Sequence, residues 1–289
     1  MIEVINRASG QKEREIVYGG AAIAWLYGGS TLGKTLAHLS ARLPFVSAFY
    51  GWLMKQPSSK KKIAPFIEKF QVDASEFKND TFNSFNDFFI RELKVEARPL
   101  SPSRFICPAD GRYRFFQNID KSDGFYIKGQ KFKLTELLKD KSLADKYSGG
   151  SMVIARLCPF DYHRFHFPHD NTPSESKLIN GYLYSVNPVA IKNDIHIFSQ
   201  NKRRMTQLVS SFGTSLYIEV GATNVGSIVE TYTPGKAVKK GDEKGYFEFG
   251  ASALILLFEP GMITLDKDLI ELSKGMHEVH CLMGQSLGS

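Results

Sequence analysis

The sequence predicts an α+β protein in which N-terminal amphipathic helices precede a β-rich core. Apolar residues recur at spacings of three and four between Ala21 and Leu53, which is the pattern of amphipathic helices. From about residue 104, short runs of β-branched and aromatic residues alternate with Gly, Pro and Asp turns, which is typical of strands. We therefore expect a helical segment over 1–100 and a β-rich core over 101–289.

The helical segment begins with an apolar stretch that carries few charges. Glycine and proline interrupt helices, so we expect breaks near Gly28–Gly29 and near Pro44. A polar, basic turn follows at Pro57–Lys62. Beyond it, the pattern indicates two further short helices, the second of them capped by Ser84 or Asn83. These helices are expected at Ile63–Phe70 and Phe85–Leu93.

The β-rich core is expected to contain several short strands separated by turns. Each is marked by β-branched or aromatic residues between turn-forming residues. The expected strands are 124–127, 152–157, 216–220, 246–258 and 279–283.

Composition sets limits on the protein class. A chain of 289 residues with 43% hydrophobic residues can bury one large core or two unequal ones. The net charge of +7 suits an anionic lipid surface, a nucleic acid or an acidic substrate equally well. No apolar run is long enough to span a membrane, and the N-terminus does not resemble a secretory signal.

The three cysteines are widely separated along the chain. Cys107, Cys158 and Cys281 form no C-x-x-C pair, so we expect reduced, buried thiols in a cytosolic compartment. Neither a disulfide framework nor a structural zinc site is expected.

Gly28–Thr35 matches the phosphate-binding pattern G-x-x-x-x-G-K-[ST]. That mechanism needs a preceding strand, a following helix and an acidic residue after a buried strand. Glu259 is the nearest acidic candidate, and no alternating βαβ pattern follows. We therefore favour a glycine break between two surface helices over a nucleotide site.

Asp161–His169 contains three of the seven histidines, His163, His166 and His169. Imidazole changes charge near neutral pH and is also a common metal ligand. The metal interpretation needs further ligands at suitable spacing, which we do not find, so acid–base chemistry is favoured and no metal is expected.

Two further positions are candidates for the same chemistry. Asp110 lies in a Pro-Ala-Asp-Gly turn, where a carboxylate either bonds its own turn amides or orients an imidazole. Ser252 follows Gly250–Ala251 in the middle of an expected strand. A glycine there indicates a bulge or a strained peptide bond beside a nucleophile.

In combination, these motifs resemble the phosphatidylserine decarboxylase family over nearly the whole chain. The stretches that carry the resemblance are Trp25–Gly28 with Gly33, Ser84–Arg91, Ala97–Pro99, Pro108–Gly111, Tyr162–His166, Gly221–Ala222 with Val225–Ile228, and Gly250–Ser252. The family usually has glycine where this chain has Ala251. The family's usual Leu-Gly-Ser triplet also occurs at Leu287–Ser289, but a cut there would release no small chain able to complete a fold.

The resemblance implies a proenzyme that cuts itself between Ala251 and Ser252. Ser252, deprotonated by His166 with Asp110 behind it, would attack the Ala251 carbonyl. The products would be a large chain 1–251 and a small chain 252–289 that share one β-rich core. A covalent pyruvoyl group derived from Ser252 would head the small chain, with no pyridoxal phosphate and no metal.

The same resemblance implies that phosphatidylserine is decarboxylated to phosphatidylethanolamine through a Schiff base to the pyruvoyl group, which acts as the electron sink. His163 would reprotonate the α-carbon. The alternatives are a serine hydrolase that uses Ser252, His166 and Asp110, and the nucleotide hydrolase considered above.

The implied partner is phosphatidylserine in an anionic membrane surface, on the cytoplasmic face of the cell membrane, and not a nucleic acid. We expect the helices of Ala21–Leu53 to lie in the membrane interface, with Lys60–Lys62 near the head groups. The alternative is a helix pair packed on the core or in a homodimer.

Overall fold

A ten-stranded sheet lies at the centre of the structure, a computed structural model that describes residues 3–17, 19–28, 30–119, 133–222, 228–250 and 252–289. Every strand pair in it is antiparallel except β1 with β14, which is parallel. In spatial order its strands are β2 (Lys12–Arg14), β1 (Glu3–Asn6), β14 (Glu278–Cys281), β4 (Gly111–Phe116), β5 (Ser151–Leu157), β13 (Ser252–Phe258), β10 (Gly213–Gly221), β9 (Arg203–Ser210) and β7 (Thr172–Pro173), with β8 (Lys177–Ile179) also paired to β9.

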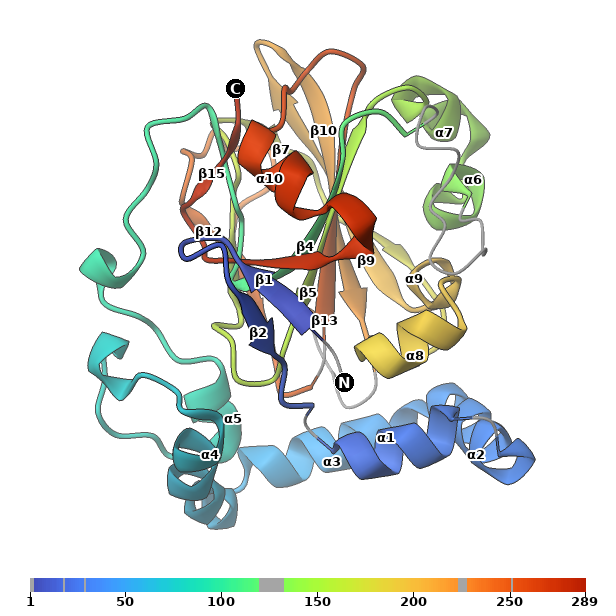
Figure 1. The fold of residues 1–289 in the computed structure, drawn as a ribbon, viewed down its shortest axis with the longest axis vertical. Helices are drawn as coiled ribbons and strands as arrows, with labels where there is room; N and C mark the ends of the chain where they lie inside the picture. Colours follow the sequence, from blue (N-terminus) through green and yellow to red (C-terminus); the bar gives the residue numbers. More distant parts are fainter. Residues whose placement is uncertain (1–2, 18, 29, 120–132, 223–227, 251) are drawn as a thin grey trace.

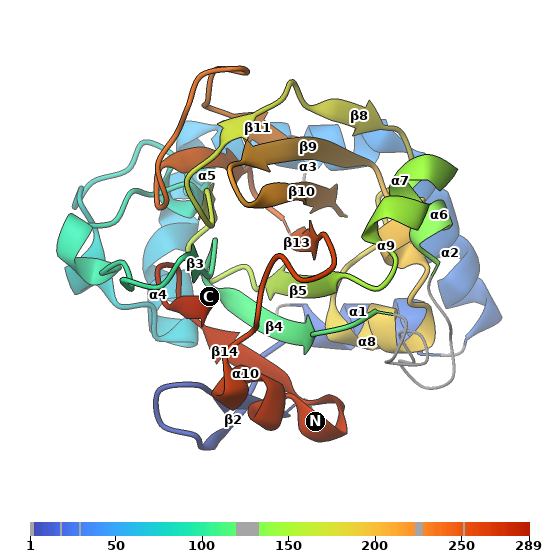
Figure 2. The same ribbon diagram turned by 90° about the horizontal axis from the view of Figure 1, so that it is seen from above.

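Helices cover one face of this sheet and small sheets cover the other (Figures 1 and 2). The helical face carries α6 (Leu134–Leu138), α7 (Lys141–Tyr147), α8 (Pro188–Asn193) and α9 (Ile197–Gln200). The opposite face carries a three-stranded sheet of β11 (Ile228–Glu230), β12 (Glu243–Phe247) and β6 (Arg164–His166), a two-stranded sheet of β15 (Ser286–Gly288) and β3 (Phe105–Ile106), and α10 (Lys267–Leu272).

The N-terminal helices lie across one end of the large sheet, at the bottom of Figure 1. A phenylalanine-rich cluster joins the third, fourth and fifth of these helices to the core. Phe249, just before the central strand β13, belongs to this cluster. The helices are α1 (Gly20–Tyr27), α2 (Thr31–Arg42), α3 (Pro44–Lys55), α4 (Ile63–Phe70) and α5 (Phe85–Phe89), with short 3-10 turns at Pro57–Lys62, Ala74–Glu76 and Val95–Ala97, and one more at Lys274–Met276.

The predicted α+β class and the N-terminal helices are confirmed. The break near Gly28 separates two helices, α1 and α2. A helix therefore precedes the glycines where a phosphate-binding loop requires a strand, which argues against a nucleotide site. None of the helices in the described residues is both long enough and apolar enough to cross a bilayer.

Several differences from the expected elements have physical causes. The run expected at 246–258 is divided into β12 and β13, which belong to different sheets. The helix expected to end at Leu93 ends at Phe89, and Arg91, two residues further on, is buried. The strand expected at 124–127 lies outside the described residues, and the boundary near residue 100 stays a prediction.

The pattern did not predict several strands, among them the long strands β4 and β9 of the large sheet. It also missed β1 and β2, which add the N-terminus to the edge of that sheet. All three residues of β2 are exposed, so this strand lacks the alternation of apolar and polar residues that marks a half-buried strand. The expected thiols are confirmed, since Cys107, Cys158 and Cys281 are free and buried.

Candidate active site

Ser252 is the first residue of β13, between β5 and β10. Its backbone pairs with Leu157 on one side and Gly221 on the other. Side chains alternate along a strand, and Leu254 packs under the small sheets, so Ser252 is directed to that same face. Its hydroxyl is fully buried and has no hydrogen-bond partner among the described residues. An unpaired buried polar group costs about 1–3 kcal/mol, which indicates a role other than structural support.

The chain just before Ser252 is held by the helical layer. The Phe249 amide donates to Asn86 Oδ1 at 2.9 Å, and the Phe249 ring packs against Phe89 with the ring centres 5.0 Å apart. Gly250 has a φ of 151°, a conformation that residues with a Cβ rarely adopt. Ala251, on one side of the expected cleavage site, lies outside the described residues.

His163 lies directly before β6 and is fully buried. Its Nδ1 faces the Asp161 carbonyl oxygen at 2.9 Å, so Nδ1 carries the proton and Nε2 has the lone pair. Nε2 is buried without a partner among the described residues. Burial lowers the pKa of His163 to about 3; Asp161 opposes this shift, and the Arg91 cation adds to it. The imidazole is therefore neutral at physiological pH.

His166 lies at the end of β6 and is also buried. Its Nδ1 donates to the Gly241 carbonyl at 2.9 Å, and its Nε2 accepts from the Tyr162 hydroxyl at 3.3 Å. Burial lowers the pKa of His166, against opposing effects of the Gly241 carbonyl, Glu243 and Asp110. His166 is thus a second neutral imidazole with a lone pair on Nε2.

Asp110 is buried in its turn and is bound by a cation. Arg98 donates to the carboxylate through Nε at 2.9 Å and Nη2 at 2.6 Å, and the Met283 amide donates to Oδ1 at 2.8 Å. Arg98 also contacts Glu76 at 2.8 Å. Asp110 is therefore a carboxylate paired with arginine.

The structure brings some of these residues together and leaves others apart. Within the described residues, no hydrogen bond joins Ser252, His166 and Asp110, so an assembled triad is not seen. His166 does contact the Asp110 turn, because its amide donates to the Pro108 carbonyl at 2.8 Å. The catalytic roles of these residues, and that of His163, stay predictions.

His163 is connected to the segment before Ser252 through one aromatic side chain. The Phe89 ring centre lies 3.9 Å from that of His163 and 5.0 Å from that of Phe249. The Phe247 amide also donates to the His163 carbonyl at 3.0 Å. His163 and the segment before Ser252 are thus packed against the same helix, α5.

Sequence reasoning assigned no role to three residues that shape the site, Asn86, Arg91 and Tyr162. All three lie within motifs that carried the family resemblance. A further signal was available for the first two, since they are polar residues within and just after a short, phenylalanine-rich segment whose side chains are mostly buried. Buried polar groups require partners.

An apolar cavity of about 260 Å³ adjoins the site between α1 and the end of the large sheet. Ile23 and Leu26 line it from α1, and Leu157, Phe249 and Gly250 line it from the core. It therefore reaches to within two residues of Ser252.

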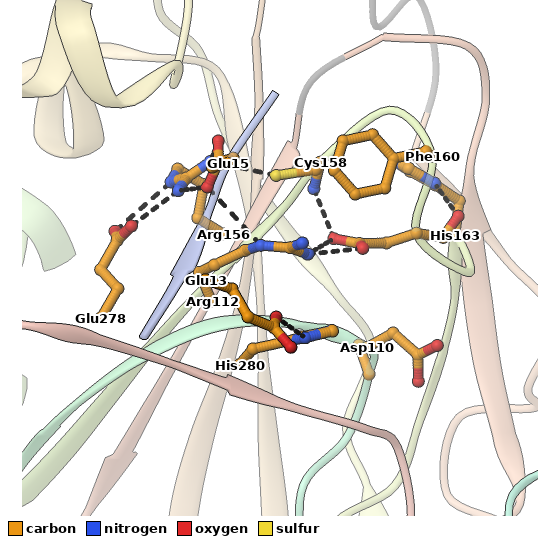
Figure 3. Close-up of polar contacts among 12 residues, drawn as sticks. Glu13, Glu15, Asp110, Arg112, Arg156, Cys158, Phe160, His163, Glu278 and His280 are labelled. Carbon is orange, nitrogen blue, oxygen red and sulfur yellow. Dashed lines mark hydrogen bonds and ion pairs between the residues drawn. The ribbon is translucent and has the colours of Figure 1, made fainter. Parts of the chain in front are cut away.

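A second, polar cavity of about 510 Å³ opens beside Asp110 and Tyr162. Figure 3 shows an ion-pair network at its edge, in which Arg156 joins Glu15, a residue that lines the cavity, at 2.7 Å to Glu278 at 2.6 Å. Two of the arginines that line this cavity are paired with carboxylates, Arg98 with Asp110 and Arg112 with Asp161.

The profile of the family described as phosphatidylserine decarboxylase matches residues 85–289. The chain belongs to the phosphatidylserine decarboxylase family. Three relatives, each named phosphatidylserine decarboxylase proenzyme, come from Chlamydia caviae, Clostridium beijerinckii and Fusobacterium nucleatum. The first is 48% identical, with 99% of this chain and 97% of the relative covered. The other two are 45% identical, with all of this chain and 99% and 97% of the relatives covered.

The match to the phosphatidylserine decarboxylase profile begins at α5, the helix that carries Asn86 and precedes Arg91. The helix that holds both His163 and the segment before Ser252 is therefore part of the region that defines the family. Helices α1 to α4 lie before this region, yet the relatives align with them over their full length.

Proposed function

We propose that this protein is a carboxy-lyase that decarboxylates phosphatidylserine to phosphatidylethanolamine and makes its own pyruvoyl group from Ser252. The relatives' names support both the substrate and a precursor form. The observation that carries the proposal is the Ser252 hydroxyl, which is buried and unpaired at the start of a central strand. Such a group is available for reaction with its own backbone.

In the proposed maturation, Ser252 Oγ attacks the Ala251 carbonyl carbon while its proton passes to His166 Nε2. The amide C–N bond breaks to leave an ester. β-Elimination then releases residues 1–251 with a free carboxylate, and hydrolysis of the remaining dehydroalanine yields ammonia and the pyruvoyl group. Because Tyr162 faces Nε2 at the long distance of 3.3 Å, its hydroxyl has to yield this position.

Asp110 supports this step through its charge. Its carboxylate acts to raise the pKa of His166, which stabilises the imidazolium formed when His166 takes the serine proton. We propose this electrostatic role in place of a direct hydrogen bond, because the Asp110 oxygens bind Arg98 and the Met283 amide.

The residues around position 252 fit a pyruvoyl group. Ser252 is fully buried, and His163 Nε2, also buried, has no partner among the described residues. The group would supply a carbonyl that accepts the electron pair left when CO₂ departs, and we propose it as the only cofactor, without pyridoxal phosphate or metal. His163 is neutral with a free Nε2, so it would take up a proton there from solvent and then deliver it to the substrate α-carbon, a release that its low pKa favours.

We further propose that the enzyme works as a peripheral protein on the cytoplasmic face of the cell membrane. Large apolar side chains project from α1 to α3 instead of packing on the core, and Lys60, Lys61 and Lys62 are exposed beside them. A lipid held there would reach position 252 through the apolar cavity under α1. The exposed side chains are Trp25, Leu32, Leu36, Leu39, Leu43, Phe45, Phe49 and Trp52.

The function is tested by incubating the protein with vesicles that contain phosphatidylserine and measuring phosphatidylethanolamine and CO₂. Wild-type protein should form both, and Ser252→Ala should form neither. If the intact chain instead reacts with a fluorophosphonate and releases fatty acid, the protein is a serine hydrolase and the proposal is wrong.

A further inference from the structure

Asn86 and Arg91 are buried polar residues to which the proposed chemistry gives no task. Asn86 is 6% exposed and Arg91 is 4% exposed, in a region made largely of phenylalanine. Arg91 has no carboxylate within ion-pair distance among the described residues, and its cation lies over the Phe77 and Phe88 rings. Burying such groups is costly unless their hydrogen bonds are satisfied.

Arg91 binds the backbone that orients His163. Its Nη2 donates to the Phe160 carbonyl at 2.9 Å and to the Asp161 carbonyl at 3.0 Å. The Asp161 carbonyl also accepts from His163 Nδ1 at 2.9 Å. One carbonyl oxygen thus joins the guanidinium to the imidazole, and its position fixes which His163 nitrogen carries the proton.

Asn86 binds the other part of the site. Its Oδ1 accepts from the Phe249 amide at 2.9 Å, three residues before Ser252. Between Asn86 and Arg91, the Phe89 ring contacts both His163 and Phe249. Residues 86–91 therefore contact both the His163 imidazole and the segment just before Ser252.

We propose that Asn86 and Arg91 are positioning residues that align His163 with the segment before Ser252 and keep its Nε2 unprotonated and free. This inference rests on the proposed function for its catalytic consequence, but the alignment itself can be measured without any activity. Asn86 acts through the Phe249 backbone, and Arg91 acts through the Asp161 carbonyl.

The charges that face His163 are few. The Arg91 cation disfavours a second positive charge on the imidazole, and the Asp161 carboxylate favours it. That carboxylate is matched by Arg112, whose Nη1 lies 2.5 Å from Oδ1. Burial lowers the pKa of Arg91 only to about 10, so its charge persists throughout the neutral range.

The first test is ¹⁵N NMR of histidine-labelled, full-length protein, with the His163 signal assigned through His163→Gln. Wild type should show the Nδ1-protonated neutral ring well below pH 6. In Arg91→Met the ring should become protonated at a pH about 1 unit or more higher, since the cation and its carbonyl contacts are both removed. Arg91→Lys, which keeps the charge, should remain close to wild type.

Arg203→Met is the matched control. Arg203 is also buried, also donates to backbone carbonyls, of Leu137, Asn201 and Glu136, and lies at the opposite face of the large sheet. It should leave the His163 titration unchanged. If His163 titrates in folded Arg91→Met as it does in wild type, or if Arg203→Met shifts the His163 titration equally, the role proposed for Arg91 is wrong.

The second test is the rate of self-cleavage, followed by the appearance of the small chain. Asn86→Ala should slow it by about 100-fold, the loss expected for a small misplacement of reacting groups. Asn86→Asp keeps the accepting oxygen and should restore most of the rate. Equal rates in Asn86→Ala and wild type, or equal slowing in both variants, would overturn the role of Asn86. If no variant cleaves and wild type also remains intact, the proposed function has failed, whereas the NMR result stands separately.

Discussion

At the scale of single residues, His163 makes the stability of the fold depend on pH. Its imidazole is fully buried and donates only to a backbone carbonyl, and its pKa falls from about 6.5 to about 3 on folding. The unfolded chain therefore binds a proton more readily than the native state. The resulting contribution is fully present above pH 6.5 and is lost as the pH falls toward 3.

We predict that acidification from pH 7 to pH 5 costs about 2 kcal/mol through His163 alone, in the free energy of unfolding. His163→Gln should flatten the pH dependence by that amount, as measured by urea unfolding at each pH. Ser151→Ala, at a buried polar residue that does not ionise, is the control and should leave the slope unchanged. Parallel curves for wild type and His163→Gln would contradict a buried neutral imidazole.

At the scale of secondary-structure elements, a buried ion pair joins two sheets. Lys244 of β12 lies 2.5 Å from Glu219 of β10, and both side chains are completely buried. The ammonium also lies over the Tyr217 and Tyr232 rings. Burial acts to lower the pKa of Lys244, but Glu219 and Glu230 outweigh it and the pKa is raised, so the ammonium keeps its charge.

We predict that Lys244→Met alone lowers the free energy of unfolding by about 3–5 kcal/mol, because it leaves Glu219 buried without its partner. The double variant Glu219→Leu/Lys244→Met should cost less than the sum of the single changes. Chemical unfolding of all four proteins measures this coupling. The surface pair of Lys146 and Glu259 provides a control cycle with little coupling, and strictly additive costs for the buried pair would contradict its role.

A second feature at this scale is the N-terminal arm, residues 3–15, which contacts the proposed small chain. Strand β1 pairs with β14. Arg7 contacts Asp266 at 2.9 Å and Asp268 at 2.8 Å, and it donates to the Ser286 carbonyl. All of these partners belong to residues 252–289, so we expect the arm to bind the proposed small chain after cleavage.

We predict that the processed small chain stays bound under native conditions, because β13 and β14 each lie between two strands of the large chain. Arg7→Ala should weaken its retention by about 2 kcal/mol, the value of charged hydrogen bonds. Size-exclusion chromatography in increasing urea follows its release. Lys12→Ala, at an exposed ion pair within the arm, should have no effect on this release. Equal release from both variants would contradict a role of Arg7 in holding the small chain.

Some elements of the fold could be predicted from the sequence and others could not. Strongly periodic elements such as Ile63–Phe70 were predicted to the residue, because a helix buries one stripe of its own side chains. Strands β1 and β2 were missed, since their pairing depends on β14 at the other end of the chain. The site histidines were found from their motif, but the contact of Arg91 with Asp161, separated by 70 residues, exists only in the folded chain.

At the scale of the whole molecule, helices α1 to α3 expose large apolar side chains. Phe45 is 64% exposed, Phe49 60% and Trp52 55%, which excludes packing on the core as the reason for these residues. Single exposed apolar residues are ordinary, but many large ones on three successive helices indicate a binding surface. A membrane interface and a dimer contact are the two candidates.

We predict that the protein floats with anionic vesicles and that a variant with Trp25, Phe45, Phe49 and Trp52 all changed to serine does not. Each side chain that enters the interface contributes about 1.5–3 kcal/mol. Light scattering of both proteins without lipid tests the other candidate. If the wild type is a dimer that does not bind vesicles, and the variant is a monomer, the surface serves self-association instead.

The central claim for the whole molecule is that the chain cuts itself before Ser252. Denaturing mass spectrometry of active protein tests it most directly, with Ser252→Ala as the uncut control. We expect two fragments, residues 1–251 and a small chain of residues 252–289 that begins with a pyruvoyl group. Active protein that shows only the intact 32.5 kDa chain would contradict the claim.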